Sequence, residues 1–253
     1  MEKKLEVSVI SPVFNERENL KTFVDSVTKV MQSTGMSWEL IVVDDGSDDG
    51  STTVIKELTN QDNIKCLLLA KNYGQTTAIQ AGFDNAIGKY LVTLDSDLQN
   101  DPKDIPALLH KLIEEELDLV VGWRKNRKDN YFLRNLPSSI ANKLIGNITG
   151  VKLHDYGCSL KAYRADVLKE VRLYGEMNRF IPAWMATKIP ASKISELVVT
   201  HHPRIAGKSK YGISRTFRVF VDLISVYFFM RFFSRPGHFF GLIGLILSSI
   251  GTI

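Results

Sequence analysis

The chain has 253 residues, enough for one large domain or for a domain with an appendage. Hydrophobic residues make up 44% and charged residues 24%, which is ordinary for a globular protein with a full core. The net charge is only +4, and no long basic tract, zinc-ligand spacing or RNA-binding signature is present, so composition argues against a nucleic-acid-binding protein. Cys66 and Cys158 form no C-x-x-C motif, so they indicate neither a disulfide framework nor a zinc site.

The N-terminal half alternates apolar runs with amphipathic stretches. The runs expected to form buried strands are 7–14, 39–45, 64–70, 90–95 and 117–123. The stretches expected to form helices are 17–33, 51–60, 74–87 and 103–115. This alternation predicts an α/β fold with a mostly parallel sheet flanked by helices. Ligands bind such sheets beyond the carboxyl ends of the strands.

Polar residues follow the first two expected strands, in "SPVFNE" (11–16) and "VVDDGSDDGS" (42–51). Carboxylates at a strand tip accept hydrogen bonds from ribose hydroxyls or a base N–H, which favours a nucleoside site. Helix capping by Asp48 or Ser51 is the structural alternative. Neither G-x-G-x-x-G nor a P-loop motif occurs, so no glycine-rich turn is available to bind the diphosphate.

The segment "LVTLDSDLQNDP" (91–102) places two acids one residue apart after an apolar run. In an extended chain Asp95, Asp97 and Gln99 point to the same side. Two neighbouring carboxylates repel each other, and a hard divalent cation such as Mg²⁺ or Mn²⁺ would relieve that repulsion. A solvated turn after a strand is the alternative interpretation.

The second half of the chain is richer in arginine and lysine, which suggests that an anionic partner binds there. We expect an interrupted helix over 131–148, a strand leading into a short helix over 158–171, a strand over 193–204 and a basic glycine-containing loop over 206–212.

The C-terminal region is strongly apolar. Residues 213–235 form an aromatic stretch with arginines at both ends, typical of an amphipathic helix in the membrane interface. A core helix against the sheet is the alternative. Residues 239–253 are uncharged, about 15 residues against the ~20 that a spanning helix needs. We therefore expect a catalytic domain over 1–212, a juxtamembrane helix over 213–235 and the beginning of a transmembrane segment over 236–253, with a buried core helix as the alternative for the last.

In this order, seven motifs resemble the GT-A glycosyltransferases of family 2. The closest resemblance is to the polyprenyl-phosphate branch, typified by the dolichyl-phosphate mannose synthases. The motifs are "PVFNE", "VVDDGSDDGS", "KNYGQTTAIQAG", "TLDSDLQNDP", "DYGCSLKAYR", "RFIP" and "HHPRIAGKSKYG". Together they cover essentially the whole chain and imply a GT-A fold.

The resemblance assigns roles by position. Residues implied to bind the nucleotide-sugar donor are Pro12, Asn15, Glu16, Asp44, Asp45, Gly46, Ser47, Lys71, Asp95 and Ser96. Those implied to hold Mg²⁺ or Mn²⁺ are Asp95, Asp97 and Gln99. Those implied to bind phosphate or the acceptor are Arg124, Lys161, Arg179, Arg204, Gly207, Ser209 and Lys210.

Asp97 and Asp155 are the catalytic candidates, and Asp155 stands where the family is usually assigned its base. A phosphate monoester has a second pKa near 6, so at pH 7 the acceptor is largely dianionic and needs little deprotonation. Two roles for Asp155 therefore stay open: a general base, or a group that positions the acceptor.

The resemblance implies an inverting, metal-dependent transfer of a sugar from a UDP- or GDP-linked donor to a polyprenyl phosphate at the membrane, with the catalytic domain on the cytoplasmic side. Homo-oligomers through membrane helices are also implied. The alternatives are a family 2 enzyme acting on a glycolipid or polysaccharide, and a non-catalytic membrane scaffold. The residues do not indicate which sugar is carried; UDP is the preferred donor nucleotide.

Overall fold

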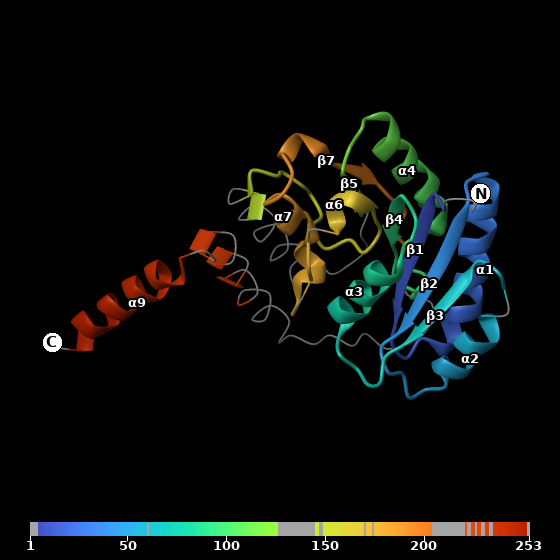
Figure 1. The fold of residues 1–253 in the computed structure, drawn as a ribbon, viewed down its shortest axis with the longest axis horizontal. Coiled ribbons are helices and arrows are strands. Elements are labelled where there is room, and N and C mark those ends of the chain that lie inside the picture. Colours follow the sequence, from blue (N-terminus) through green and yellow to red (C-terminus); the bar gives the residue numbers. More distant parts are fainter. Residues whose placement is uncertain are drawn as a thin grey trace.

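A computed structural model describes residues 5–59, 61–125, 145–146, 149–169, 171–173, 175–203, 221, 224–225, 227–228, 231–232 and 235–251. A single sheet runs through the described part of the chain, with helices on both faces (Figure 1). The strands are β1 (Val7–Val13), β2 (Trp38–Asp44), β3 (Ile64–Leu68), β4 (Tyr90–Thr93), β5 (Leu119–Trp123), β6 (Lys161–Arg164) and β7 (Ile194–Val198).

Helices connect most of these strands. The α-helices are α1 (Arg17–Ser33), α2 (Ser51–Leu58), α3 (Gln75–Asn85), α4 (Ile105–Glu114), α6 (Ala165–Leu168), α7 (Ile181–Met185) and α9 (Pro236–Gly251). Short 3₁₀ helices are η1 (Pro102–Asp104), η3 (Met177–Phe180) and η4 (Ala191–Lys193). The elements expected in the N-terminal half are therefore present, with ends shifted by a few residues.

The strand order is β3-β2-β1-β4-β6-β5-β7. Every pair is parallel except for β6, which runs antiparallel to both β4 and β5. Val13 pairs with Asp44 and Ile10 with Thr93, so the carboxyl ends of β1, β2 and β4 meet at one edge of the sheet. The prediction of a mostly parallel sheet is confirmed, and the polar tips of separate strands become neighbours.

Burial on both faces explains the apolar strands. All seven residues of β2 are buried, as expected for a central strand covered by helices. On one face, α1 buries the helical stripe formed by Leu20, Phe23, Val24 and Val27. Each such side chain contributes about 1.5–3 kcal/mol when it is removed from water. The sheet is thus a rigid base for the loops at its edge.

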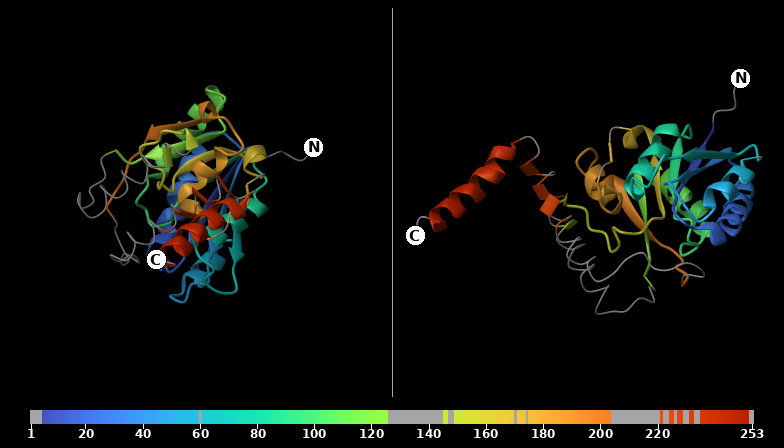
Figure 2. Two further views of the ribbon diagram at one scale, coloured as in Figure 1. Left: turned by 90° about the vertical axis from the view of Figure 1, so that its left-hand side faces the viewer. Right: turned by 90° about the horizontal axis from the view of Figure 1, so that it is seen from below.

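The expected membrane segment is not supported. α9 has 16 residues, and among the described residues no helix is both long and apolar enough to cross a bilayer. α9 lies apart from the sheet in Figure 1 and in the right-hand view of Figure 2, and its side chains Phe240, Leu245 and Ile250 are exposed. Most of 131–148 and of 213–235, where two further helices are expected, lies outside the described residues.

The contact between α3 and β1 leaves no room for a side chain at Gly82. A Cβ atom there would lie 2.2 Å from Cγ2 of Ile10, a fully buried residue of β1. Replacing Gly82 by alanine must therefore displace either the helix or Ile10.

We expect Gly82→Ala to cost about 1–3 kcal/mol of unfolding free energy through overpacking. The thermal midpoint should fall by several degrees, because each kcal/mol corresponds to about 2–4 °C in a chain of this size. Thr77→Ala, at an exposed position of the same helix, is the control and should change the midpoint little. Equal midpoints for Gly82→Ala and the wild type would contradict the close approach.

Candidate active site

The tips of β1 and β2 are joined by hydrogen bonds. The Asn15 backbone N–H donates to Ser47 Oγ (3.0 Å), and its side-chain amide donates to Asp48 Oδ1 (2.7 Å). In return, the Asp48 N–H donates to Asn15 Oδ1 (3.0 Å). Asn15 has a φ of 55°, in the left-handed region that Asn tolerates. The two loops therefore form one polar surface.

Asp44 helps to shape this surface. Its Oδ1 accepts the N–H of Ser47 (3.0 Å), and its Oδ2 accepts the hydroxyl of Thr52 (2.5 Å). Glu16 is anchored nearby, because its N–H donates to Ser51 Oγ (3.1 Å). The β1–β2 tip is thus fixed before any ligand arrives.

Asp45 ties this tip to the loop after β3. Its two oxygens accept the N–H groups of Tyr73 (2.8 Å) and Gly74 (2.9 Å). Burial raises the pKa of Asp45, although those two N–H groups act in the opposite direction. Gly46, at φ 71°, lies so close to this loop that a Cβ would be 2.4 Å from the carbonyl carbon of Lys71. The predicted donor residues of this region therefore lie together.

The two acids of the β4 tip lie in a tightly packed environment. Asp95 Oδ1 accepts from the side chain of Gln75 (2.7 Å), the first residue of α3. Asp97 is buried, and its Oδ1 accepts the N–H of Gln99 (3.1 Å). Burial, together with the negative charge of Asp97, raises the pKa of Asp95 to about 6. The unfavourable charge arrangement expected from the sequence is therefore present.

The residues present fit a divalent cation. Asp95, Asp97 and Gln99 offer carboxylate and amide oxygens, the donor type that Mg²⁺ and Mn²⁺ prefer. No group of three or more His, Cys, Asp or Glu suited to a metal occurs among the residues that the structure describes. Such a small donor set cannot enclose an ion, so further ligands would have to come from a substrate or water.

Arg124 and Asp155 form a two-pronged ion pair. Arg124 Nε donates to Oδ2 (2.7 Å) and Nη2 to Oδ1 (3.0 Å), and both side chains are largely buried. This fork is among the strongest charge-assisted contacts in proteins. Both oxygens of Asp155 are therefore engaged with one guanidinium.

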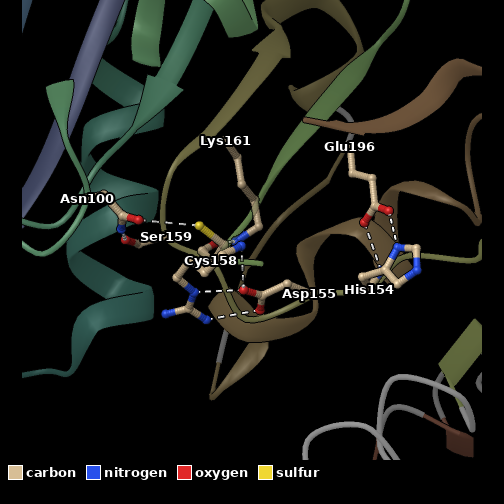
Figure 3. Close-up of polar contacts among 8 residues, drawn as sticks. Asn100, His154, Asp155, Cys158, Ser159, Lys161 and Glu196 are labelled. Atoms are coloured by element: carbon tan, nitrogen blue, oxygen red, sulfur yellow. Dashed lines mark hydrogen bonds and ion pairs between the residues drawn. The ribbon is translucent and has the colours of Figure 1, made fainter. Parts of the chain in front are cut away.

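Lys161, at the start of β6, is a second buried cation. Its ammonium group donates to the backbone carbonyl of Cys158, and burial lowers its pKa. Asp155 and Cys158, in the loop that precedes β6, lie close to Lys161, the first residue of that strand (Figure 3). The positive charges of Lys161 and Arg124 act on Asp95 and lower its pKa, against the larger effect of burial. The site thus combines the acids Asp95 and Asp97 with the cations Lys161 and Arg124.

The chain after β7 runs beside the acidic tip. The His202 N–H donates to the carbonyl of Gln99 (2.7 Å), and His201 forms an antiparallel bridge with Asn100. His202 Nε2 also lies 3.2 Å from Asp101 Oδ2. This segment leads toward the predicted phosphate-binding loop, but Arg204, Gly207, Ser209 and Lys210 lie outside the described residues.

The remaining predicted residues occupy less central places. Ser96 Oγ donates to the carbonyl of Pro12 (3.4 Å), which links the tips of β4 and β1. Arg179 lies on η3, 3.5 Å from Glu176, and η3 contacts α3 through a hydrogen bond between Asn178 and Thr76.

Sequence reasoning missed several supporting residues. Gln75 binds Asp95, and Ser159 also contributes a side-chain hydrogen bond to it. Asn100 donates to Ser159 Oγ (2.8 Å). Gln75 lies in the segment that follows the carboxyl end of β3, and this position could have predicted that it lies at the sheet edge. No local pattern places Ser159 beside Asp95.

The raised pKa of Asp95 has a consequence for stability. A carboxyl whose pKa is higher in the folded state than in the unfolded chain stabilises the fold at pH values below its ordinary pKa of 3.8, and this stabilisation disappears as the pH rises through about 6. Without metal, we expect Asp95→Asn to raise the thermal midpoint at pH 7.5 and to raise it much less at pH 4.5, where Asp95 is protonated.

Asp25→Asn, at an exposed position of α1, is the control and should change the midpoint equally little at both pH values. A midpoint of Asp95→Asn that falls below the wild type by the same amount at both pH values would show that Asp95 carries no charge penalty.

Comparison with known proteins identifies the family. The profile of Glycosyl transferase family 2 matches residues 8–172. A dodecaprenyl-phosphate galacturonate synthase of Rhizobium johnstonii is 55% identical over 251 residues, covering 98% of this chain and 74% of the relative. An undecaprenyl-phosphate 4-deoxy-4-formamido-L-arabinose transferase of Yersinia pestis is 38% identical over 96% of this chain and 74% of the relative.

Solved structures agree on the fold. Mannosyl-3-phosphoglycerate synthase from Rubrobacter xylanophilus superimposes with a TM-score of 0.70 at 13% identity, over 88% of this chain and 74% of that one. Glucosyl-3-phosphoglycerate synthase from Mycobacterium tuberculosis gives 0.67 at 18% identity, over 89% and 80%. At such low identity these matches concern the fold alone, and the predicted GT-A fold is confirmed. With the profile match and the relative at 55% identity, they establish that this chain is a glycosyltransferase that belongs to Glycosyl transferase family 2.

Proposed function

We propose that this enzyme transfers a sugar from a nucleotide-diphosphate donor to a polyprenyl phosphate, with inversion at the anomeric carbon. The observation that carries the proposal is the charge arrangement at the sheet edge. The acids Asp95 and Asp97 lie beside the cations Arg124 and Lys161, next to the joined tips of β1 and β2. The names of the relatives, which include two polyprenyl-phosphate sugar enzymes, support the acceptor class.

The donor would bind across the tips of β1, β2 and β4. The nucleoside would contact the polar surface that contains Asn15 and Asp44, with UDP as the preferred nucleotide. Asp95, Asp97 and Gln99 would hold Mg²⁺ or Mn²⁺, which neutralises developing charge on the leaving diphosphate when it is bound. A lipid-phosphate oxygen would form the new bond to the anomeric carbon while the carbon–oxygen bond to the diphosphate breaks.

The acceptor phosphate would meet the basic side chains. Arg124 and Lys161 supply fixed positive charge beside the acids, as expected for a site that binds two phosphate groups. The predicted phosphate contacts of Arg179, Arg204, Gly207, Ser209 and Lys210 remain part of the proposal. Because Arg124 engages both oxygens of Asp155, we assign Asp155 a positioning role rather than that of a general base.

A uronic acid is the preferred sugar within this proposal. The relative that shares 55% of its residues with this chain is named a galacturonate synthase, whereas those named for a formamido-arabinose share 36–38%. The cations Arg124 and Lys161, next to the acids, are the groups that would meet the carboxylate of such a sugar.

The enzyme would work at a membrane, because a polyprenyl phosphate resides in the bilayer, and the cytoplasmic side is the one that the family resemblance implies. Residues 1–212 would form the catalytic domain, and the exposed apolar side chains of α9 would contact lipid. The juxtamembrane role of 213–235 and assembly into homo-oligomers belong to the same proposal.

Incubation with a panel of nucleotide sugars and a short polyprenyl phosphate tests the activity directly. We expect a glycosylated lipid phosphate, detected by mass spectrometry, with UDP-galacturonate giving the largest yield. EDTA should abolish the product, and Mn²⁺ or Mg²⁺ should restore it. Undiminished turnover in EDTA would contradict the cation assignment, and product formation only with a glycolipid or polysaccharide acceptor would contradict the acceptor assignment.

Asp97→Ala separates an enzyme from a scaffold. Loss of a cation-binding carboxylate should lower kcat by at least about 100-fold. Glu114→Ala, an exposed acid on α4, is the control and should leave turnover unchanged. Full activity of Asp97→Ala would remove Asp97 from the site.

A further inference from the structure

Glu196, on β7, uses both of its carboxylate oxygens to bind a single residue, His154. Oε2 accepts the backbone N–H of His154 (2.8 Å), and Oε1 binds Nδ1 of the same imidazole. A carboxylate only accepts, so the His154 ring must carry a proton on Nδ1. The Glu196 side chain is 82% shielded from solvent, whereas that of His154 is 63% exposed. Glu196 thus fixes both the main chain and the ring of His154.

One face of the imidazole is also held. The His154 ring stacks on Trp123, with ring centroids 4.0 Å apart and an interplanar angle of 13°. Trp123 ends β5 and Glu196 lies on β7, and these strands pair in parallel with Trp123 opposite Val198. The carbonyl of Trp123 also accepts the N–H of Val199 (3.0 Å). Two paired strands therefore hold His154: β7 through the carboxylate of Glu196 and β5 through the indole of Trp123.

Both residues of the ring stack, Trp123 and His154, are followed directly in the sequence by a member of the buried ion pair. Arg124 follows Trp123 and Asp155 follows His154, so the stack and the fork are successive links between the same two segments. The Arg124 N–H itself lies 3.4 Å from Asp155 Oδ2, which shows how closely the two backbones approach. Figure 3 shows the side chain of His154 next to Glu196, and that of Asp155 pointing away from this pair. A shift of the backbone at residue 154 would therefore act directly on the residue that carries the paired carboxylate.

We propose that Glu196, acting through His154 and its stack on Trp123, is a positioning residue that sets the geometry of the Arg124–Asp155 pair during sugar transfer. The inference rests on the proposed function, because it assigns Glu196 to the catalytic step of that reaction. Small displacements of catalytic groups by changes away from the chemistry lower rates by up to about 100-fold. The proposed nucleotide site lies at the tips of β1 and β2, so nucleotide affinity should not depend on Glu196.

The test compares E196A, E196Q and H154F with the wild type. E196A removes both acceptors, E196Q keeps one oxygen for the His154 N–H, and H154F keeps the stack but loses the Nδ1 contact. The control is E114A, which breaks a second histidine–glutamate pair, His110 with Glu114 (2.9 Å), on the exposed face of α4. Measurements are kcat and KM in the transfer assay, calorimetric affinity for UDP with Mn²⁺, and thermal midpoint.

We expect kcat of E196A to fall by about tenfold or more, with UDP affinity within about twofold of the wild type. E196Q should recover part of the loss, H154F should lie between E196A and the wild type, and E114A should match the wild type. A kcat of E196A within about twofold of the wild type would overturn the proposal. So would a parallel loss of UDP affinity, or failure of both E196A and E196Q to fold, since each outcome makes Glu196 a stability residue.

Hydrogen–deuterium exchange separates this inference from the proposed function. Wild-type protein that transfers no sugar to polyprenyl phosphate would contradict the proposed function, whatever happens at Glu196. In that case the hydrogen–deuterium exchange of peptides covering 149–158 tests whether Glu196 holds His154 in place. Faster exchange in E196A than in E114A would support this role. Equal exchange in the two variants would overturn it.

Discussion

Asp95 and Asp97 repel each other at the end of β4, and the surrounding site is organised around that repulsion. Packing removes water from Asp95, which strengthens every charge interaction it makes. Gln75 and Ser159 donate hydrogen bonds to it, while Arg124 and Lys161 contribute positive charge. These groups only partly compensate, because the pKa of Asp95 still rises to about 6. A pair of acids left short of positive charge in this way is suited to a cation.

Several acidic residues near the sheet edge also stabilise the loops by accepting hydrogen bonds. Asp44 and Asp45 direct their oxygens at loop N–H and hydroxyl groups, and Asp48 pairs with Asn15. These bonds fix the shape of the β1–β2 tip in the absence of ligand. Polar groups held in place beforehand stabilise a bound charge without a reorganisation cost. The acidic motif therefore builds the polar surface that we propose binds the nucleotide, in addition to lining it.

The antiparallel strand β6 explains why distant segments meet. It is inserted between β4 and β5, so its first residue, Lys161, lies between the tips that carry Asp95 and Arg124. The loop before β6 brings Asp155 onto Arg124 from the same direction. Were β6 parallel, the chain would enter from the opposite edge of the sheet, and this loop would lie far from both acids.

The sequence by itself determined the alternating α/β order, the apolar strands and the polar tips, because side-chain period and turn chemistry act over a few residues. It correctly paired Asp95 with Asp97, but the extended geometry expected for 95–99 is wrong, because β4 ends at Thr93 and the chain turns at 96–99, with Leu98 at a φ of 59°. Only the tertiary structure decided that both Asp155 oxygens bind Arg124 and that Gln75 and Ser159 support Asp95. It alone revealed the grip of Glu196 on His154. Those contacts join residues 20 to 64 positions apart, and strand order and direction, which no local pattern encodes, bring them together.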